Sequence, residues 1–471
     1  MRGENATENL SLLDGMAELM VLSNYGSAKN IILFGMGLEG QLDESAMQGA
    51  LIKALDGFPH FLSGVRECRY MGSNRLMWSD QKDLVPVLQV SDLEIPDESL
   101  SFEDRLLAHL DGSLNKDWDL LRTVPTEFHV LHHSQGRHSF IGLVQHAAAD
   151  AWTISRFIKR LLGGYHEIMS GQPPPWQSEG VRRHLPVKGR SKTDSELWRH
   201  LLFLIRKGLM PSIREQYFPK ISHNGNGRAE HHIKVVLPTD ESRNIINRAA
   251  RENFTPLDVV IGGVNTAIDE WNRALYIPAG IITTGLTVQM RRRHGPTDAP
   301  VNSSAILLKS NPTQRADHAS FGRFISVQRV SRFRSRMDVS ISQAALSLAK
   351  AVRLLPLAMR RKAVHYFLGR PMCSVLVTWL GNGWSGAQGR RFTTDLLARK
   401  VGDLEVSEIH GIGHALALKA PIRVWGGLFR ERFNLVFTLG GEHFTRPEAE
   451  SFVERALRTV IENPFGCTSC D

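Results

Sequence analysis

The chain has 471 residues, of which 42% are hydrophobic and 22% charged, a composition typical of globular proteins and a length that predicts two or three domains. The formal net charge of +9 leaves nucleic acid, an anionic surface or an acidic protein open as a partner. No zinc-finger, RNA-recognition or helix-turn-helix signature accompanies this charge, and four cysteines are too few for a disulfide scaffold.

The two ends of the sequence carry no strong signal. The polar start lacks the basic and apolar regions of a signal peptide, and no apolar run is long enough to span a bilayer, so we expect a cytoplasmic protein. Cys467 and Cys470 provide at most half of a zinc site, and no second CxxC pair completes it. We therefore expect no bound metal.

The first part of the chain predicts strands and helices in alternation. Residues 30–38 predict a strand, the helix after Asp43 runs to Leu55, and a short helix is expected over 102–114. Residues 127–133 and 138–144 predict two strands joined by a tight turn, because apolar runs flank a short polar segment that contains glycine.

The stretch Gln145–Ala151 follows the second of these strands directly. Apolar residues then recur at helical spacing from Ile154 to Tyr165, and the helix is expected to end near Gly171. His146 therefore lies where a strand ends, and Asp150 lies where a helix begins. Strand ends are positions at which rigid scaffolds present catalytic side chains.

A polar, basic segment over 176–230 predicts a crossover between two lobes, with one helix over 195–207. The second half then alternates again between the two element types. Strands are expected over 232–237, 281–290, 300–308, 375–380 and 433–439, and helices over 239–250, 257–275 and after 443.

Gln145–Ala151 resembles the HHxxxDG signature of condensation domains and chloramphenicol-acetyltransferase-like acyltransferases. His146 matches the second histidine and Asp150 the aspartate, whereas Gln145 replaces the first histidine and Ala151 the glycine. Looser similarities to this group follow in the family's order at 58–66, 232–257, 281–308, 375–384 and 433–460.

The resemblance implies an α/β (α+β) fold with two pseudo-symmetric chloramphenicol-acetyltransferase-like lobes, arranged in a V with a channel between them. On this basis residues 1–180 form the N-terminal lobe, 181–230 the crossover, and 231–471 the C-terminal lobe. A monomer is expected.

The same resemblance assigns roles to individual residues. His146 is expected to act as the general base, and a neutral imidazole suits that task near physiological pH. Asp150 is expected to pair with Arg291 and hold the loop in shape, although a carboxylate at this spacing could instead orient the imidazole. Gln145 is expected at the substrate channel. Three further positions are candidates for lining the channel or binding the oxyanion, or else are ordinary core and turn residues: Thr378, Asn382 and Trp384.

The implied function is transfer of an acyl group from a pantetheine thioester to a hydroxyl or amine, giving an ester or amide in secondary-metabolite or lipid assembly. No cofactor is expected beyond the 4′-phosphopantetheine of a carrier protein acting in trans, or the coenzyme A, that carries the acyl group. The alternative is a catalytically silent relative that binds a carrier protein, and nucleic-acid binding is the weakest candidate. The sequence does not determine the acyl chain, the acceptor or the type of bond.

Three other patterns have simpler interpretations. His132 and His133 lie inside a predicted strand and face opposite sides of it. The segment His410–His414 contains two glycines and no carboxylate, so it does not predict a metal site. The arginine-rich runs at 323–336 and 353–362 are interpreted as solvated helix faces.

Overall fold

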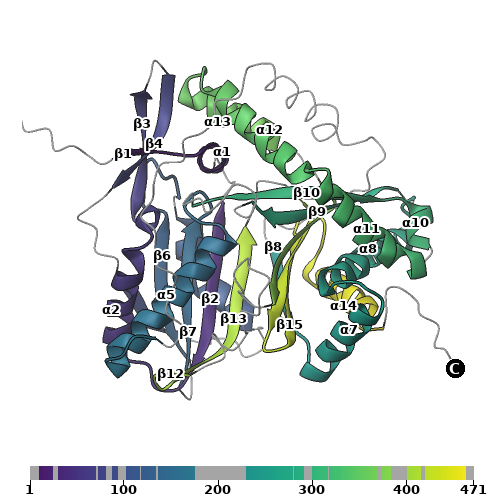
Figure 1. Ribbon diagram of the computed structural model, residues 1–471, viewed down its shortest axis with the longest axis horizontal. Coiled ribbons are helices and arrows are strands. Elements are labelled where there is room, and N and C mark those ends of the chain that lie inside the picture. Colours follow the sequence, from purple (N-terminus) through teal and green to yellow (C-terminus); the bar gives the residue numbers. More distant parts are fainter. Residues whose placement is uncertain are drawn as a thin grey trace, which may run out of the picture.

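The computed structural model describes most of the chain (Figure 1). The described residues are 10–24, 30–70, 73–80, 87–93, 102–116, 118–133, 136–174, 230–278, 280–290, 300–316, 318–368, 373–382, 400–414 and 420–462. The helix expected over 195–207 lies outside them. None of the helices in these ranges has the length and apolar character required to cross a membrane.

The first lobe is built on a sheet with the strand order β12-β13-β2-β7-β6-β5. Its strands are Lys400–Val401 (β12), Leu404–His414 (β13), Ile31–Glu39 (β2), Arg137–Gln145 (β7), Thr126–His132 (β6) and Leu88–Asp92 (β5). Strands β2, β7 and β6 pair antiparallel, and each agrees with its predicted range to within one residue.

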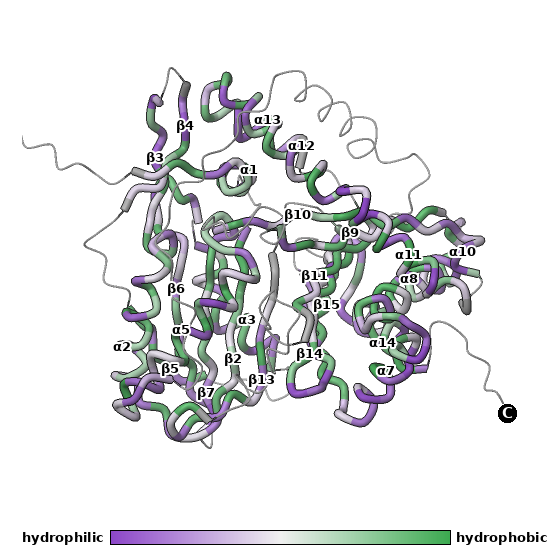
Figure 2. The backbone as a smooth tube through the Cα atoms, in the orientation of Figure 1, coloured by the Kyte–Doolittle hydropathy of each residue, from purple (hydrophilic) through white to green (hydrophobic). Residues whose placement is uncertain are grey.

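Helices α2 (Glu44–Leu55) and α5 (Ala151–Ser170) cover one face of this sheet (Figure 1). Because side chains alternate along a strand, Phe34 and Phe140 pack in the core beneath the helices, and Leu33 and Ile141 pack in a second core on the other face. In Figure 2, apolar and polar stretches alternate along α5, as expected for a helix with one face on a core. Helix α5 ends at Gly171 in the left-handed conformation (φ 68°), which confirms the predicted end.

The second lobe is built on a sheet with the order β10-β9-β11-β14-β15-β8. Its strands are Ser303–Ser310 (β10), Ile282–Gln289 (β9), Val375–Asn382 (β11), Ile422–Phe429 (β14), Arg432–Gly440 (β15) and Glu230–Val236 (β8). The helices of this lobe include Thr239–Arg251 (α7), Pro256–Ala274 (α8), Pro312–Ala316 (α10), His318–Arg334 (α11) and Arg446–Glu462 (α14). Helix α8 begins with a capping box between Thr255 and Asp258, and Pro256 occupies its first turn.

Strand β11 runs parallel to both of its neighbours, β9 and β14, so the carboxyl ends of all three strands meet at one edge of the second sheet. Strand β10 is antiparallel to β9 and begins at this same edge, where Ser303 pairs with Gln289. This edge faces the loop that follows β7, where Asp150 bonds to Asn302 and Pro300.

A small third sheet has the order β1-β4-β3 and lies close to three helices. The elements are Leu10–Leu12 (β1), Ser63–Tyr70 (β3), Ser73–Asp80 (β4), Gly15–Ser23 (α1), Met337–Val352 (α12) and Leu357–Leu368 (α13). Helices α12 and α13 come from the second half of the chain and pack against α1. Pro59–Phe61 forms a short 3-10 helix (η1), and the single helix expected over 102–114 is instead two, Phe102–His109 (α3) and Asp111–Asn115 (α4).

A strand from the second half of the chain extends the sheet of the first lobe. Strand β13 comes from the range assigned to the C-terminal lobe, yet it pairs along β2 from Glu405 to His414 and extends the sheet of the first lobe (Figure 1). The glycines of this strand make the packing possible, because a side chain at Gly411 would lie 2.5 Å from the ring of Trp425 on β14. A strand from the second half of the chain is therefore part of the first lobe's sheet.

The interpretation of the arginine-rich runs as solvated faces is wrong for several members. Arg353 donates two hydrogen bonds to Glu18 on α1, at 2.8 Å and 2.5 Å. The Arg360 side chain is fully buried, 3.8 Å from Glu18, and also pairs with Glu67. Burial lowers the pKa of Arg360, and the charge of Glu18 opposes this effect. These pairs attach α12 and α13 to the first lobe.

We expect Glu18→Gln to destabilise the protein by about 3–5 kcal/mol, because the change removes the buried carboxylate that pairs with Arg353 and lies beside the fully buried Arg360. Urea unfolding followed by circular dichroism measures the loss. The matched control is Glu431→Gln, which breaks the exposed pair with Arg243 and should cost no more than about 1 kcal/mol. Equal midpoints for the two variants would contradict the assigned role of Glu18.

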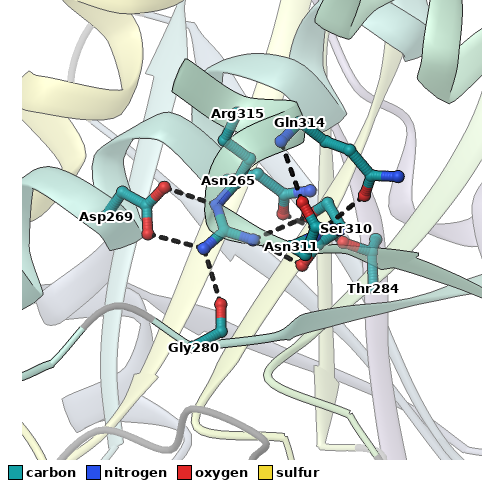
Figure 3. Close-up of polar contacts among 8 residues, drawn as sticks. All are labelled: Asn265, Asp269, Gly280, Thr284, Ser310, Asn311, Gln314 and Arg315. Carbon is teal, nitrogen blue, oxygen red and sulfur yellow. Dashed lines mark hydrogen bonds and ion pairs between the residues drawn. The ribbon is translucent and has the colours of Figure 1, made fainter. Parts of the chain in front are cut away.

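A further buried cation, Arg315, lies where β10 ends and β9 begins. Figure 3 shows its polar contacts. Arg315 of α10 forms an ion pair with Asp269 of α8 and donates to the carbonyl of Gly280 at 2.7 Å. Its remaining nitrogen reaches Ser310, the last residue of β10. Every nitrogen of this guanidinium is satisfied within the protein, so the cluster is a structural anchor of the second lobe.

Candidate active site

The loop from Gln145 to Asp150 connects the end of β7 to the start of α5, and its backbone is held at several points. Gln145 donates its N–H to the carbonyl of Pro125 at 2.7 Å, and His146 donates its own to the carbonyl of Asn30 at 2.7 Å. The alanines at 147–149 are fully buried. The loop is thus a packed, hydrogen-bonded turn.

The His146 imidazole is half-buried, and its Nδ1 atom lies 2.9 Å from the carbonyl oxygen of Ala149. A carbonyl can only accept, so Nδ1 must carry the proton of this hydrogen bond. In the neutral ring the basic lone pair is therefore on Nε2. The Nε2 atom has no hydrogen bond to any residue within the described ranges, which leaves it available to a substrate.

Asn30, which accepts the backbone N–H of His146, was not among the sequence candidates. It is fully buried, and its side-chain amide donates to Ser23 and to the carbonyl of Met20 at 3.1 Å. Its backbone N–H donates to the side chain of Asn24 at 3.2 Å. The available signal was an asparagine directly before an apolar strand, which is too common a pattern to single out.

The Asp150 carboxylate contacts both lobes. One carboxylate oxygen caps α5 by accepting from the backbone N–H of Thr153 at 2.9 Å, and the other accepts from the backbone N–H of Asn302 at 2.9 Å. Its own N–H donates to the carbonyl of Pro300 at 3.1 Å. Asp150 thus joins the loop after β7 to the residues before β10, while its expected partner Arg291 lies outside the described residues.

The two departures from the HHxxxDG signature differ in their consequences. Ala151 is the first residue of α5 and is helical, so glycine's freedom is not needed there. Gln145 is completely buried, and its side-chain oxygen accepts from the N–H of Ala147 at 2.5 Å. The amide that replaces the first histidine is therefore part of the loop's own structure.

The remaining sequence candidates lie on or after β11. Thr378 is half-buried and lies opposite Trp425 of β14. The backbone of Asn382 pairs with Leu428 at the carboxyl end of the strand. Trp384 lies outside the described residues. The structure places β11 beside β9, whose end at Met290 bonds to the Asn302 carbonyl at 2.9 Å, so this strand shares an edge with the partners of Asp150.

A second polar group lies where β13 meets β8 and α3. His410, only 3% exposed, has its Nδ1 atom 3.2 Å from the ammonium of Lys234, which also pairs with Glu408 and Glu103. The ring of Phe102 packs between His410 and His133. Burial, with the charge of Lys234, lowers the pKa of His410 to about 3. Within the described ranges no cluster of His, Cys, Asp and Glu has metal-binding geometry, and Cys467 and Cys470 lie outside them.

We expect this histidine to weaken the fold in acid. The unfolded chain binds a proton at His410 below about pH 6.5, whereas the folded protein does so only near pH 3. The contribution of His410 to the free energy of unfolding is therefore complete above pH 6.5 and is lost as the pH falls below that value. The slope is about 1.4 kcal/mol per pH unit for this group. His410→Gln should flatten the dependence of the unfolding midpoint between pH 6.5 and 4, and His365→Gln on α13 should not. An unchanged slope in His410→Gln would contradict the assignment.

Comparisons with known proteins agree with this architecture. The sequence matches no protein-family model and no curated protein. Solved structures do match over nearly the whole chain. The trichothecene 15-O-acetyltransferase of Fusarium sporotrichioides aligns with a TM-score of 0.67 at 13% identity, covering 98% of this chain and 96% of its own.

Two further structures give the same result. The first condensation domain of the CDA synthetase aligns with a TM-score of 0.61 at 14% identity, covering 99% of this chain and 98% of its own. Polyketide synthase associated protein 5 from Mycobacterium tuberculosis aligns with a TM-score of 0.60 at 14% identity, covering 97% and 99%. The chain therefore has the α/β fold shared by condensation domains and condensation-like acyltransferases.

Proposed function

We propose that the protein is an acyltransferase that moves an acyl group from a pantetheine thioester to a hydroxyl or amine, with His146 as the general base. The observation that carries the proposal is the hydrogen bond from Nδ1 of His146 to the carbonyl of Ala149, because it leaves the basic lone pair on Nε2. The similarity to an acetyltransferase and to condensation domains supports the reaction class.

In the proposed reaction, Nε2 of His146 removes the proton from the acceptor's hydroxyl or amine as the acceptor oxygen or nitrogen attacks the thioester carbonyl. The tetrahedral intermediate then collapses, the carbon–sulfur bond breaks, and the departing thiolate takes the proton from the imidazolium. The products are an ester or amide and a free pantetheine thiol. No covalent enzyme intermediate is needed, and the ring returns to its starting state.

The donor in this proposal is acyl-coenzyme A or a carrier protein acting in trans, and the acceptor is a small alcohol or amine. Solved structures of similar fold come from synthetases and a trichothecene acetyltransferase, which supports a place in secondary-metabolite assembly. The second candidate is a catalytically silent protein that binds a carrier protein, and the observation that favours it is Gln145 at the position of the first histidine.

The test incubates the wild-type protein and His146→Ala with acyl-coenzyme A and with acyl-pantetheine, each with a panel of alcohols and amines, and detects esters, amides and free thiol. The proposal expects His146→Ala to form products about 10²–10⁴-fold more slowly than the wild type. Equal rates for the two proteins would exclude His146 as the base. Carrier-protein binding without any product would favour the silent protein.

A further inference from the structure

Gln145 accepts hydrogen bonds from the backbone N–H groups of two successive residues in the loop from Gln145 to Asp150. Its backbone carbonyl accepts from the N–H of Ala148 at 2.9 Å, and its side-chain oxygen accepts from the N–H of Ala147 at 2.5 Å. The residue is the last of β7, pairs with Ile31 of β2, and is completely buried. One rigid strand residue therefore determines how the chain turns immediately after it.

The turn controls the only hydrogen bond that orients the His146 ring within the described structure. That bond needs the carbonyl of Ala149 to point back at Nδ1, and the direction of this carbonyl depends on the path of the chain through Ala147. Without an acceptor for the N–H of Ala147, a buried donor would be left unpaired, and the turn would relax to satisfy it. Gln145 is thus connected to His146 through the backbone.

We propose that Gln145 is a positioning residue that fixes the tautomer and orientation of His146, an inference that rests on the proposed acyl transfer. The side-chain oxygen of Gln145 acts here as an acceptor, because the N–H of Ala147 can only donate. The amide nitrogen of Gln145 has no hydrogen-bond partner among the described residues. A carboxamide accepts at every pH, whereas a histidine at this site could accept only while neutral. The amide therefore makes the geometry of the base independent of a neighbouring titration.

The test compares Gln145→Met, which keeps the length of the side chain but removes the acceptor, with Gln145→His. We expect Gln145→Met to lower kcat about 10- to 100-fold with little change in KM, because a misplaced base slows the chemical step. Gln145→His should retain activity in base, with an acid limb of the kcat/KM profile that steepens from one proton to two. A merely structural role would not change this slope.

The matched control is Gln48→Met. Gln48 of α2 also accepts a backbone N–H, that of Leu88 on the edge strand β5, at 2.8 Å. It should lose comparable stability while keeping wild-type kcat and a one-proton acid limb. Wild-type kcat in folded Gln145→Met, or an unchanged acid limb in Gln145→His, would overturn the inference.

A second measurement separates this inference from the proposed function. Nitrogen-15 NMR of the histidine side chains reports the tautomer of His146 without any turnover. The wild type should show the Nδ1-protonated form alone, and Gln145→Met a mixture of both tautomers. If the wild type shows this form but transfers no acyl group, the proposed function fails and the positioning role stands. The same single tautomer in Gln145→Met would overturn the positioning role.

Discussion

Replacing His146 with alanine is expected to lower kcat/KM for acyl transfer by about 10²–10⁴-fold, the usual contribution of a positioned general base. The loss should fall on the chemical step, because the ring is held by a single hydrogen bond to Ala149 and its Nε2 atom has no structural contact among the described residues. Removing that one bond should cost no more than about 1.5 kcal/mol of stability. Steady-state rates of thiol release and a urea unfolding curve measure the two effects.

His138→Ala is the matched control for this variant. His138 lies on the same strand β7 and contacts His132 at 2.7 Å, far along the strand from the loop. It should retain wild-type kcat/KM. A similar loss of activity in both variants would show that the effect of His146→Ala arises from the sheet rather than from a missing base.

The second large effect is expected for Asp150→Asn. The variant puts an NH₂ group where one carboxylate oxygen accepts a backbone N–H, either that of Thr153 or that of Asn302. Two donors then face each other in a buried site, which should cost about 1–3 kcal/mol of stability. The backbone bond from residue 150 to Pro300 remains, but the side-chain link between the loop and the second lobe weakens, so we also expect kcat to fall by up to about 10²-fold.

Asp43→Ala distinguishes this link from ordinary helix capping. Asp43 caps α2 through the N–H of Ala46 at 2.8 Å and, among the described residues, forms no hydrogen bond with the second lobe. Its loss should cost about 1 kcal/mol and leave kcat unchanged. If Asp150→Asn kept wild-type stability and wild-type kcat, neither a structural nor an orienting role would remain for Asp150.

Much of the fold could be predicted because local pattern and tertiary environment agree. The alternation in 127–144 and the helical spacing after Ala151 follow directly from burial on one face, and both ranges are confirmed. Strand β13 was missed for the opposite reason. Its segment His410–His414 is rich in glycine and histidine, and it becomes a strand only because β2 offers an unpaired edge.

The candidate site was predictable in part for a similar reason. The position of His146 at a strand end and of Asp150 at a helix start follows from local periodicity, and the structure places both there. The partners Asn30 and Asn302 contribute backbone atoms from distant parts of the chain. A backbone contact leaves no mark on the residue type, so the sequence could not reveal it.

The most direct test of the central claim is acyl transfer by His146→Asn. The amide of asparagine can still donate to the carbonyl of Ala149, as Nδ1 does, but it has no counterpart of the basic Nε2 atom. We predict a folded protein with wild-type stability and donor binding that transfers the acyl group at least about 10²-fold more slowly than the wild type. Transfer at the wild-type rate would contradict the assignment of His146 as the base.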